Sequence, residues 1–146
     1  MRILVFAGVA MGGFDQADIH YARDKLAEIA TTHPALFKMG YGSADNPGGA
    51  PLTAADPAEF LRAVEFLKRL EPIPTPDRNR TSTGYTHIAE RWWHRHHCDD
   101  SLADSRISNG VFIAAAITLG FPIRRIYDNR NVQVGISSRS LRVLDR

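Results

Sequence analysis

The chain has 146 residues, of which 44% are hydrophobic and 23% are charged. A chain of this length is expected to form a single domain over residues 1–146 and to bury about 70% of the surface that its unfolded form exposes. Its 11 glycines and 8 prolines are too few for a collagen-like or wholly disordered chain. A lone cysteine, Cys98, excludes an internal disulfide, so a reducing cytoplasm is the expected location. No apolar run approaches the roughly 20 residues of a membrane span, so no membrane partner is expected.

The net charge of +2 hides an uneven distribution. Residues 101–146 contain seven arginines and three acidic residues, and the chain favours arginine over lysine throughout. Arginine suits two-pronged recognition of phosphate or carboxylate, although a codon bias would give the same ratio without any ligand. The small total charge is far from the strongly basic surface typical of nucleic-acid binders. The sequence therefore indicates a small anionic partner rather than a nucleic acid.

The first part of the chain predicts a strand, a helix and a second strand. Ile3 to Gly8 is an apolar run typical of a strand. Asp15 can cap a helix whose apolar residues recur at steps of three and four, and His33-Pro34 ends it. Ala35 to Tyr41 predicts a second strand, which leads into a loop over residues 42–55.

A second helix with a clear start leads into a proline-rich connector. Asp56 is a good N-cap, Pro57 suits the first helical position, and Glu59 would complete a capping box. The connector, residues 71–84, contains three alternating prolines that exclude a helix in its first half. Because loops of this length are usually functional or disordered, the connector is a candidate lid, or an arm that reaches a second subunit.

The third and fourth helices follow from their hydrophobic patterns. Residues 85–98 place an apolar face opposite a polar face that carries His87, Glu90, His94 and His97. Asn109 to Leu119 is apolar nearly all round and should be deeply buried, with Gly120 as its stop. We expect these helices to form the core of the domain.

The last part of the chain predicts a β-hairpin. Ile123 to Tyr127 and Val132 to Ser137 have strand patterns, and residues 128–131 are good turn formers. The order of the elements predicts an α+β fold. We expect a small mixed or antiparallel sheet with a C-terminal hairpin, packed against a layer of about four helices.

Histidines near the end of the third helix suggest a metal site. His94 and His97 stand three residues apart, and Asp99 could add a carboxylate, which are ligands that zinc and related metals use. This hypothesis implies a divalent metal cofactor and a hydrolase or nuclease. Neither His-Glu-x-x-His nor paired Cys-x-x-Cys is present, and a solvated polar face or an anion-binding surface explains the same residues.

The start of the fourth helix is the strongest candidate for binding an anion. A hydroxyl, an amide and unhindered backbone N–H groups stand at the positive end of the helix dipole, and Asp104 is the nearest carboxylate in sequence. Neighbouring arginines could bind phosphate, and a tryptophan could stack on a base. An ordinary N-cap with its arginines in solvent is the alternative. The candidate ligand-binding residues are Arg106, Ser108, Asn109, Gly110, Arg124, Arg125, Trp92 and Trp93.

Two blocks, Ser108 to Gly120 and Asn131 to Ser137, resemble small bacteriophage-encoded proteins. Asn109 followed by Arg124 or Arg125, with aromatic residues upstream, resembles the phage anti-Thoeris sponge family. That resemblance implies a homo-oligomer in the host cytoplasm that sequesters cyclic ADP-ribose signals without cleaving them and so counteracts host defence. It also implies that Asn109 contacts the ligand, an arginine its phosphates and Trp92 or Trp93 its base.

The sequence leaves three functions open. We expect a non-catalytic protein that binds a small phosphorylated nucleotide, because neither a Gly-x-Ser-x-Gly elbow nor a cysteine-hydrolase signature is present and no catalytic residue can be named. The metal-dependent hydrolase or nuclease is the second hypothesis. A protein-interaction inhibitor of a host factor is the third.

Overall fold

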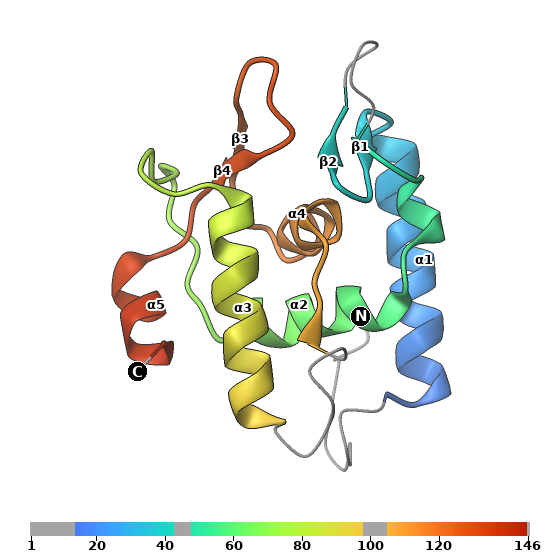
Figure 1. Cartoon of the computed structure of the whole chain (residues 1–146), viewed down its shortest axis with the longest axis horizontal. Coiled ribbons are helices and arrows are strands. Elements are labelled where there is room, and N and C mark those ends of the chain that lie inside the picture. Colours follow the sequence, from blue (N-terminus) through green and yellow to red (C-terminus); the bar gives the residue numbers. More distant parts are fainter. Residues whose placement is uncertain (1–13, 43–47, 98–104, 146) are drawn as a thin grey trace.

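The computed structural model describes residues 14–42, 48–97 and 105–145. The α+β class is confirmed, since these residues form α-helices and two small antiparallel hairpins (Figure 1). The predicted strand at residues 3–8 lies outside the described residues. The elements are α1 Gln16–Thr32, β1 Leu36–Phe37, β2 Gly40–Tyr41, the 3-10 helix η1 Leu52–Ala54, α2 Pro57–Leu67, α3 Ser82–His96, α4 Asn109–Thr118, β3 Ile123–Arg125, β4 Val132–Val134 and α5 Ser138–Leu144.

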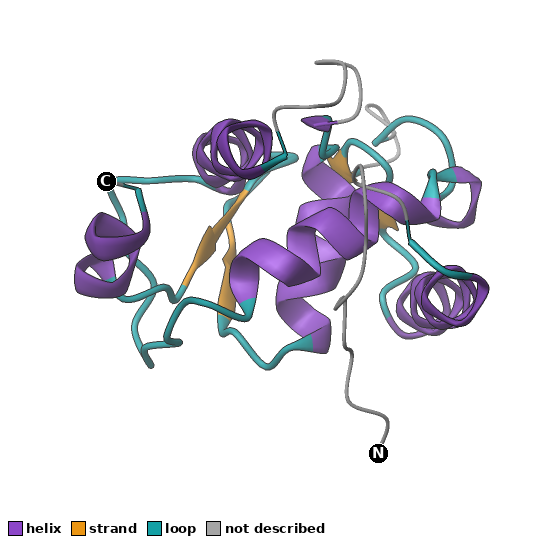
Figure 2. Cartoon of the chain, turned by 90° about the horizontal axis from the view of Figure 1, so that it is seen from below, coloured by secondary structure: helices purple, strands orange, loops and turns teal. Residues whose placement is uncertain are grey.

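Helix α4 lies at the centre of the helical layer. Its residues from Asn109 to Ala116 are all buried, as its continuous apolar sequence predicts. It packs against α1, α2 and α3. In Figure 1 it is seen nearly end-on above α2, and in Figure 2 α1 and α3 are seen end-on at either side of the central helices. Gly120, at a φ of +83°, follows its last turn as the predicted stop.

The starts of α1 and α2 are confirmed. The Asp15 side chain accepts a hydrogen bond from Asp18 N (2.8 Å), and that of Asp56 accepts one from Ala58 N (3.0 Å). Pro57 occupies the first position of α2. The structure gives Glu59 a different role from the predicted capping box. Its Oε1 accepts a hydrogen bond from the backbone N–H of Ser108 (2.7 Å), at the start of another helix.

Several elements differ from the prediction. The strand expected at residues 35–41 is a tight hairpin of β1 and β2, because the chain reverses before Gly40, whose φ is +127°. The single expected sheet is two separate two-stranded sheets. Helix α3 begins at Ser82, three residues early, where the Ser82 hydroxyl accepts a hydrogen bond from Val132 N (3.1 Å). The chain leaves the second hairpin at Val134 and forms α5, which the sequence analysis did not predict.

The first residues of the connector pack against the segment after β4. Ile73 N donates to Gly135 O (2.9 Å), and Ser137 N donates to Glu71 O (2.8 Å). Pro76, further along, is buried. This part of the connector is therefore bound to its own chain, and its last three predicted residues belong to α3.

The two hairpins lie on the same side of α4 and are joined through its first turn (Figure 1). Gly110 N donates to Lys38 O (2.8 Å), in the turn between β1 and β2. The Asn109 amide nitrogen lies 3.1 Å from Met39 O and 3.5 Å from Arg130 O. Tyr41 N also donates to Arg130 O (3.0 Å), which links the hairpins directly. No helix among the described residues is long and apolar enough to cross a membrane.

The close approach at Gly110 gives a stability prediction. A Cβ there would overlap the carbonyl oxygens of Phe37 and Lys38. We expect Gly110→Ala to lower the free energy of unfolding by about 2 kcal/mol or more, measured by urea denaturation. Gly84→Ala, inside α3, is the control, because its Cβ would meet only the flexible side chain of Arg80 at 3.3 Å. That variant should be unchanged or up to about 1 kcal/mol more stable, and equal losses in the two variants would contradict the prediction.

Candidate ligand-binding site

A cavity of about 360 Å³ lies beside the first turn of α4, and we call it the α4 cavity. One wall is a face of α3 that includes Thr83, Thr86, His87 and Glu90. The remaining wall is formed by Met39, Arg106, Ile107, Ser108, Asn109 and Arg130. Three of the predicted ligand-binding residues, Arg106, Ser108 and Asn109, therefore lie together at this cavity.

The backbone N–H groups before α4 are already hydrogen-bonded within the chain. Ile107 N donates to Glu90 Oε2 (2.9 Å) and Ser108 N to Glu59 Oε1 (2.7 Å), while Gly110 N is held by Lys38 O. The expectation of free N–H groups remote from any carboxylate was therefore wrong. Packing brings a glutamate from α2 and a glutamate from α3 to the start of α4. A phosphate at this helix end would compete with those carboxylates. Gly110 does not line the cavity.

Two arginines, Arg106 and Arg130, line the α4 cavity. Arg106 and Arg130 are exposed, but their backbones are held in place. The buried Arg62 donates through Nε (3.1 Å) and Nη2 (2.7 Å) to Arg106 O. Arg130 O accepts from Tyr41 N (3.0 Å). Arg106 and Arg130 thus line the same cavity from fixed points of the backbone.

The same cavity contains hydrogen-bond acceptors in fixed positions. Glu90 is half-buried and is oriented by Ile107 N through Oε2. Asn109 is only 8% exposed, and its Oδ1 is buried without a hydrogen-bond partner among the described residues. Its amide nitrogen contacts Met39 O, so the orientation of the amide is set by that contact.

The predicted stacking residues Trp92 and Trp93 lie in the core and not at the cavity. Each is 3% exposed. Trp92 packs against Phe66 with a centroid separation of 5.8 Å, and Trp93 stacks on His97 at 3.7 Å. The apolar face of α3 thus serves packing, which was the alternative role for a tryptophan pair.

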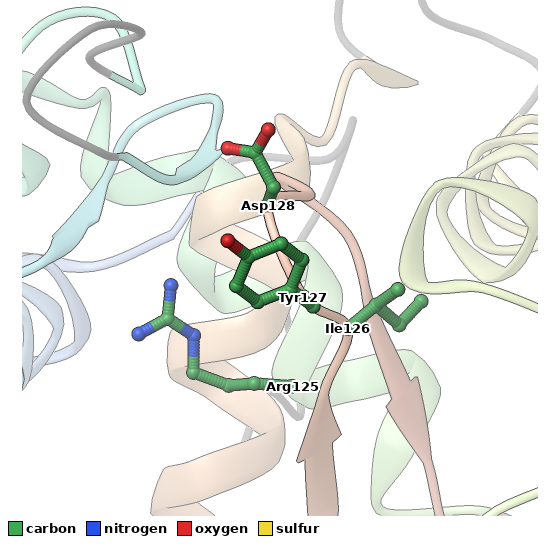
Figure 3. A pocket seen from close by; sticks show the side chains of 4 residues that line it. All are labelled: Arg125, Ile126, Tyr127 and Asp128. Carbon is green, nitrogen blue, oxygen red and sulfur yellow. The ribbon is translucent and has the colours of Figure 1, made fainter.

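The arginines of β3 also lie away from the α4 cavity. Arg124 contacts Gln133 on β4 (3.4 Å), and the Arg125 guanidinium lies 4.0 Å from the centroid of the Tyr41 ring. Arg125 lines a separate open hollow of about 550 Å³ with Ile126, Tyr127 and Asp128 (Figure 3). Figure 3 shows the side chains of Arg125 and Tyr127 extending to one side of the hairpin and that of Ile126 to the other.

The proposed metal ligands are not assembled within the described residues. His97 stacks on Trp93, and its Nδ1 lies 3.0 Å from Trp93 O. Asp99 lies outside the described residues. Over residues 14–42, 48–97 and 105–145 there is no group of three metal-ligating side chains. The metal site stays a prediction.

Sequence reasoning missed the part of the cavity that α3 contributes. Thr83, Thr86, His87 and Glu90 recur at steps of three and four, which is the signal of one helix face. His87 and Glu90 were placed on the polar face, but nothing in the sequence indicated that this face borders the start of α4. Comparison of the chain with family models, with curated proteins and with solved structures finds no match.

The contact between Arg125 and Tyr41 predicts a pH-dependent signature. Burial raises the pKa of the Tyr41 hydroxyl above its ordinary value, and the Arg125 cation opposes this rise. We expect Arg125→Ala to raise the pKa of Tyr41 further, measured from its ring carbon shifts by NMR during an alkaline titration. Arg124→Ala, which removes the neighbouring charge, should change it less. A Tyr41 pKa that falls or stays constant in Arg125→Ala would disprove the contact.

Proposed function

We propose that the protein is a non-catalytic binder of a small phosphorylated nucleotide, which occupies the α4 cavity. The observation that carries this proposal is the convergence of Arg106 and Arg130, from two separate segments, on one cavity. Paired guanidinium groups are well suited to a phosphate, because each can donate two parallel hydrogen bonds. The phosphate is expected at the arginine side chains and not at the occupied backbone N–H groups of α4.

The size and rigidity of the α4 cavity support a small ligand. Its volume of about 360 Å³ falls in the range of small-molecule sites, roughly 300–1,000 Å³. The hydrogen bonds to the carbonyls of Arg106 and Arg130 fix the points from which the two side chains extend. Preorganisation of this kind lowers the ordering cost of binding.

Two of the three hydroxyl groups in the cavity wall, those of Thr83 and Thr86, are hydrogen-bonded within the chain. Thr83 Oγ donates to Asn131 Oδ1 (2.5 Å), and Thr86 Oγ donates to Thr83 O (2.7 Å). Both hydroxyls are used to hold the start of α3, whereas an activated nucleophile donates its proton to a base. The biological role that we propose is to sequester a nucleotide signal as a homo-oligomer.

Isothermal titration calorimetry with AMP, GMP, CMP and UMP tests the site. We expect at least one of them to bind, and Arg106→Gln or Arg130→Gln to weaken it about tenfold or more, because each removes a charge-assisted hydrogen bond. The matched control is Arg142→Gln, which removes an exposed arginine of α5 and should bind as the wild type does. The parent nucleoside should bind more weakly than its monophosphate.

The proposal fails if none of the four nucleotides binds. It also fails if Arg106→Gln and Arg130→Gln behave like Arg142→Gln. Native mass spectrometry of the purified protein measures the oligomeric state and any nucleotide that is retained.

A further inference from the structure

We infer that the α4 cavity selects nucleotides whose base carries the amino group of adenine or cytosine, and that Glu90 is the residue that determines this specificity. The inference rests on the proposed function, since it concerns the base of the same nucleotide. It is based on two hydrogen-bond acceptors in the cavity wall that receive no hydrogen bond from the described residues.

Glu90 has one oxygen in use and one available. Oε2 accepts the hydrogen bond from Ile107 N at 2.9 Å, which fixes the direction of the carboxylate. Oε1 has no hydrogen-bond partner within the described residues. It is also exposed, because the buried polar atoms without a partner do not include it. Since Glu90 lines the cavity, Oε1 is an accessible acceptor there. A carboxylate accepts hydrogen bonds and does not donate them.

Asn109 provides a second acceptor in the same wall. The side chain is 8% exposed, and its amide nitrogen is held by Met39 O at 3.1 Å. The amide oxygen is left buried without a donor from the described chain. Buried polar atoms in proteins are nearly always hydrogen-bonded, so a donor from a ligand or from a bound water would satisfy this oxygen.

These groups define the chemistry of the ligand. Arg106 and Arg130 attract an anion, while Glu90 and Asn109 require N–H donors. The exocyclic amino group of adenine or cytosine is such a donor. Hypoxanthine and uracil place a carbonyl oxygen at the same position, which would face the Glu90 carboxylate with no proton between two acceptors.

The test compares two pairs of ligands that differ at this one group. By calorimetry, the wild-type protein should bind AMP at least tenfold more tightly than IMP, or CMP at least tenfold more tightly than UMP. In Glu90→Gln, the amide Oε1 can keep the hydrogen bond from Ile107 N and turn Nε2 into the cavity as a donor. The preference should then reverse toward IMP or UMP. A residue with a merely structural role would weaken both members of a pair equally.

Glu28→Gln is the control, because Glu28 is exposed on α1 and pairs with Lys25 away from the cavity. It should leave the preference unchanged. If amino and oxo partners bind wild-type protein equally, or if Glu90→Gln keeps the wild-type preference, this inference is overturned while the proposed function stands. If none of the nucleotides binds, the proposed function fails as well.

Discussion

The first turn of α4 finds its hydrogen-bond acceptors in three other parts of the chain. Ile107 N is bound by Glu90 of α3, Ser108 N by Glu59 of α2 and Gly110 N by the carbonyl of Lys38 in the first hairpin. Buried backbone N–H groups have to be satisfied, and the residues from Ile107 to Gly110 are all buried. The positions of α2, α3 and the first hairpin relative to α4 therefore depend on this one turn.

The same constraint shapes the α4 cavity. Because Glu90 reaches across to Ile107, the polar face of α3 stands opposite the start of α4 and leaves a space that both line. The helix dipole is balanced by carboxylates of the protein itself. In the function that we propose, arginine side chains recognise the anion, and the carboxylate that balances the dipole selects the rest of the ligand.

Features fixed by neighbours in sequence were predictable. Asp15, Asp56, Gly120 and the apolar repeat of α4 each determine local structure through capping, backbone conformation or periodicity. Features fixed by distant contacts were not. Helix α3 starts early because Ser82 meets Val132, fifty residues away, and Glu59 leaves its expected capping role for a buried N–H.

The candidate site divides in the same way. Arg106, Ser108 and Asn109 could be named because they adjoin a recognisable helix start. Arg130 appeared as part of a turn, and Glu90 as part of a solvated helix face, since only packing brings them to that start. Trp92 and Trp93 were assigned to a base because aromatic residues serve both stacking and cores, and their neighbours Phe66 and His97 decide between the two.

The pairing of the connector with the segment after β4 bears on the order in which the protein is assembled during translation. Glu71 and Ile73 leave the ribosome well before Gly135 and Ser137, to which they bind. Helices α1 and α2 can pack together as soon as both have emerged, and α3 and α4 can join them later. The connector therefore stays unpaired in the growing chain until the segment after β4 has been synthesised. Its prolines suit this interval, because they hold an extended conformation that neither forms a helix nor recruits another strand.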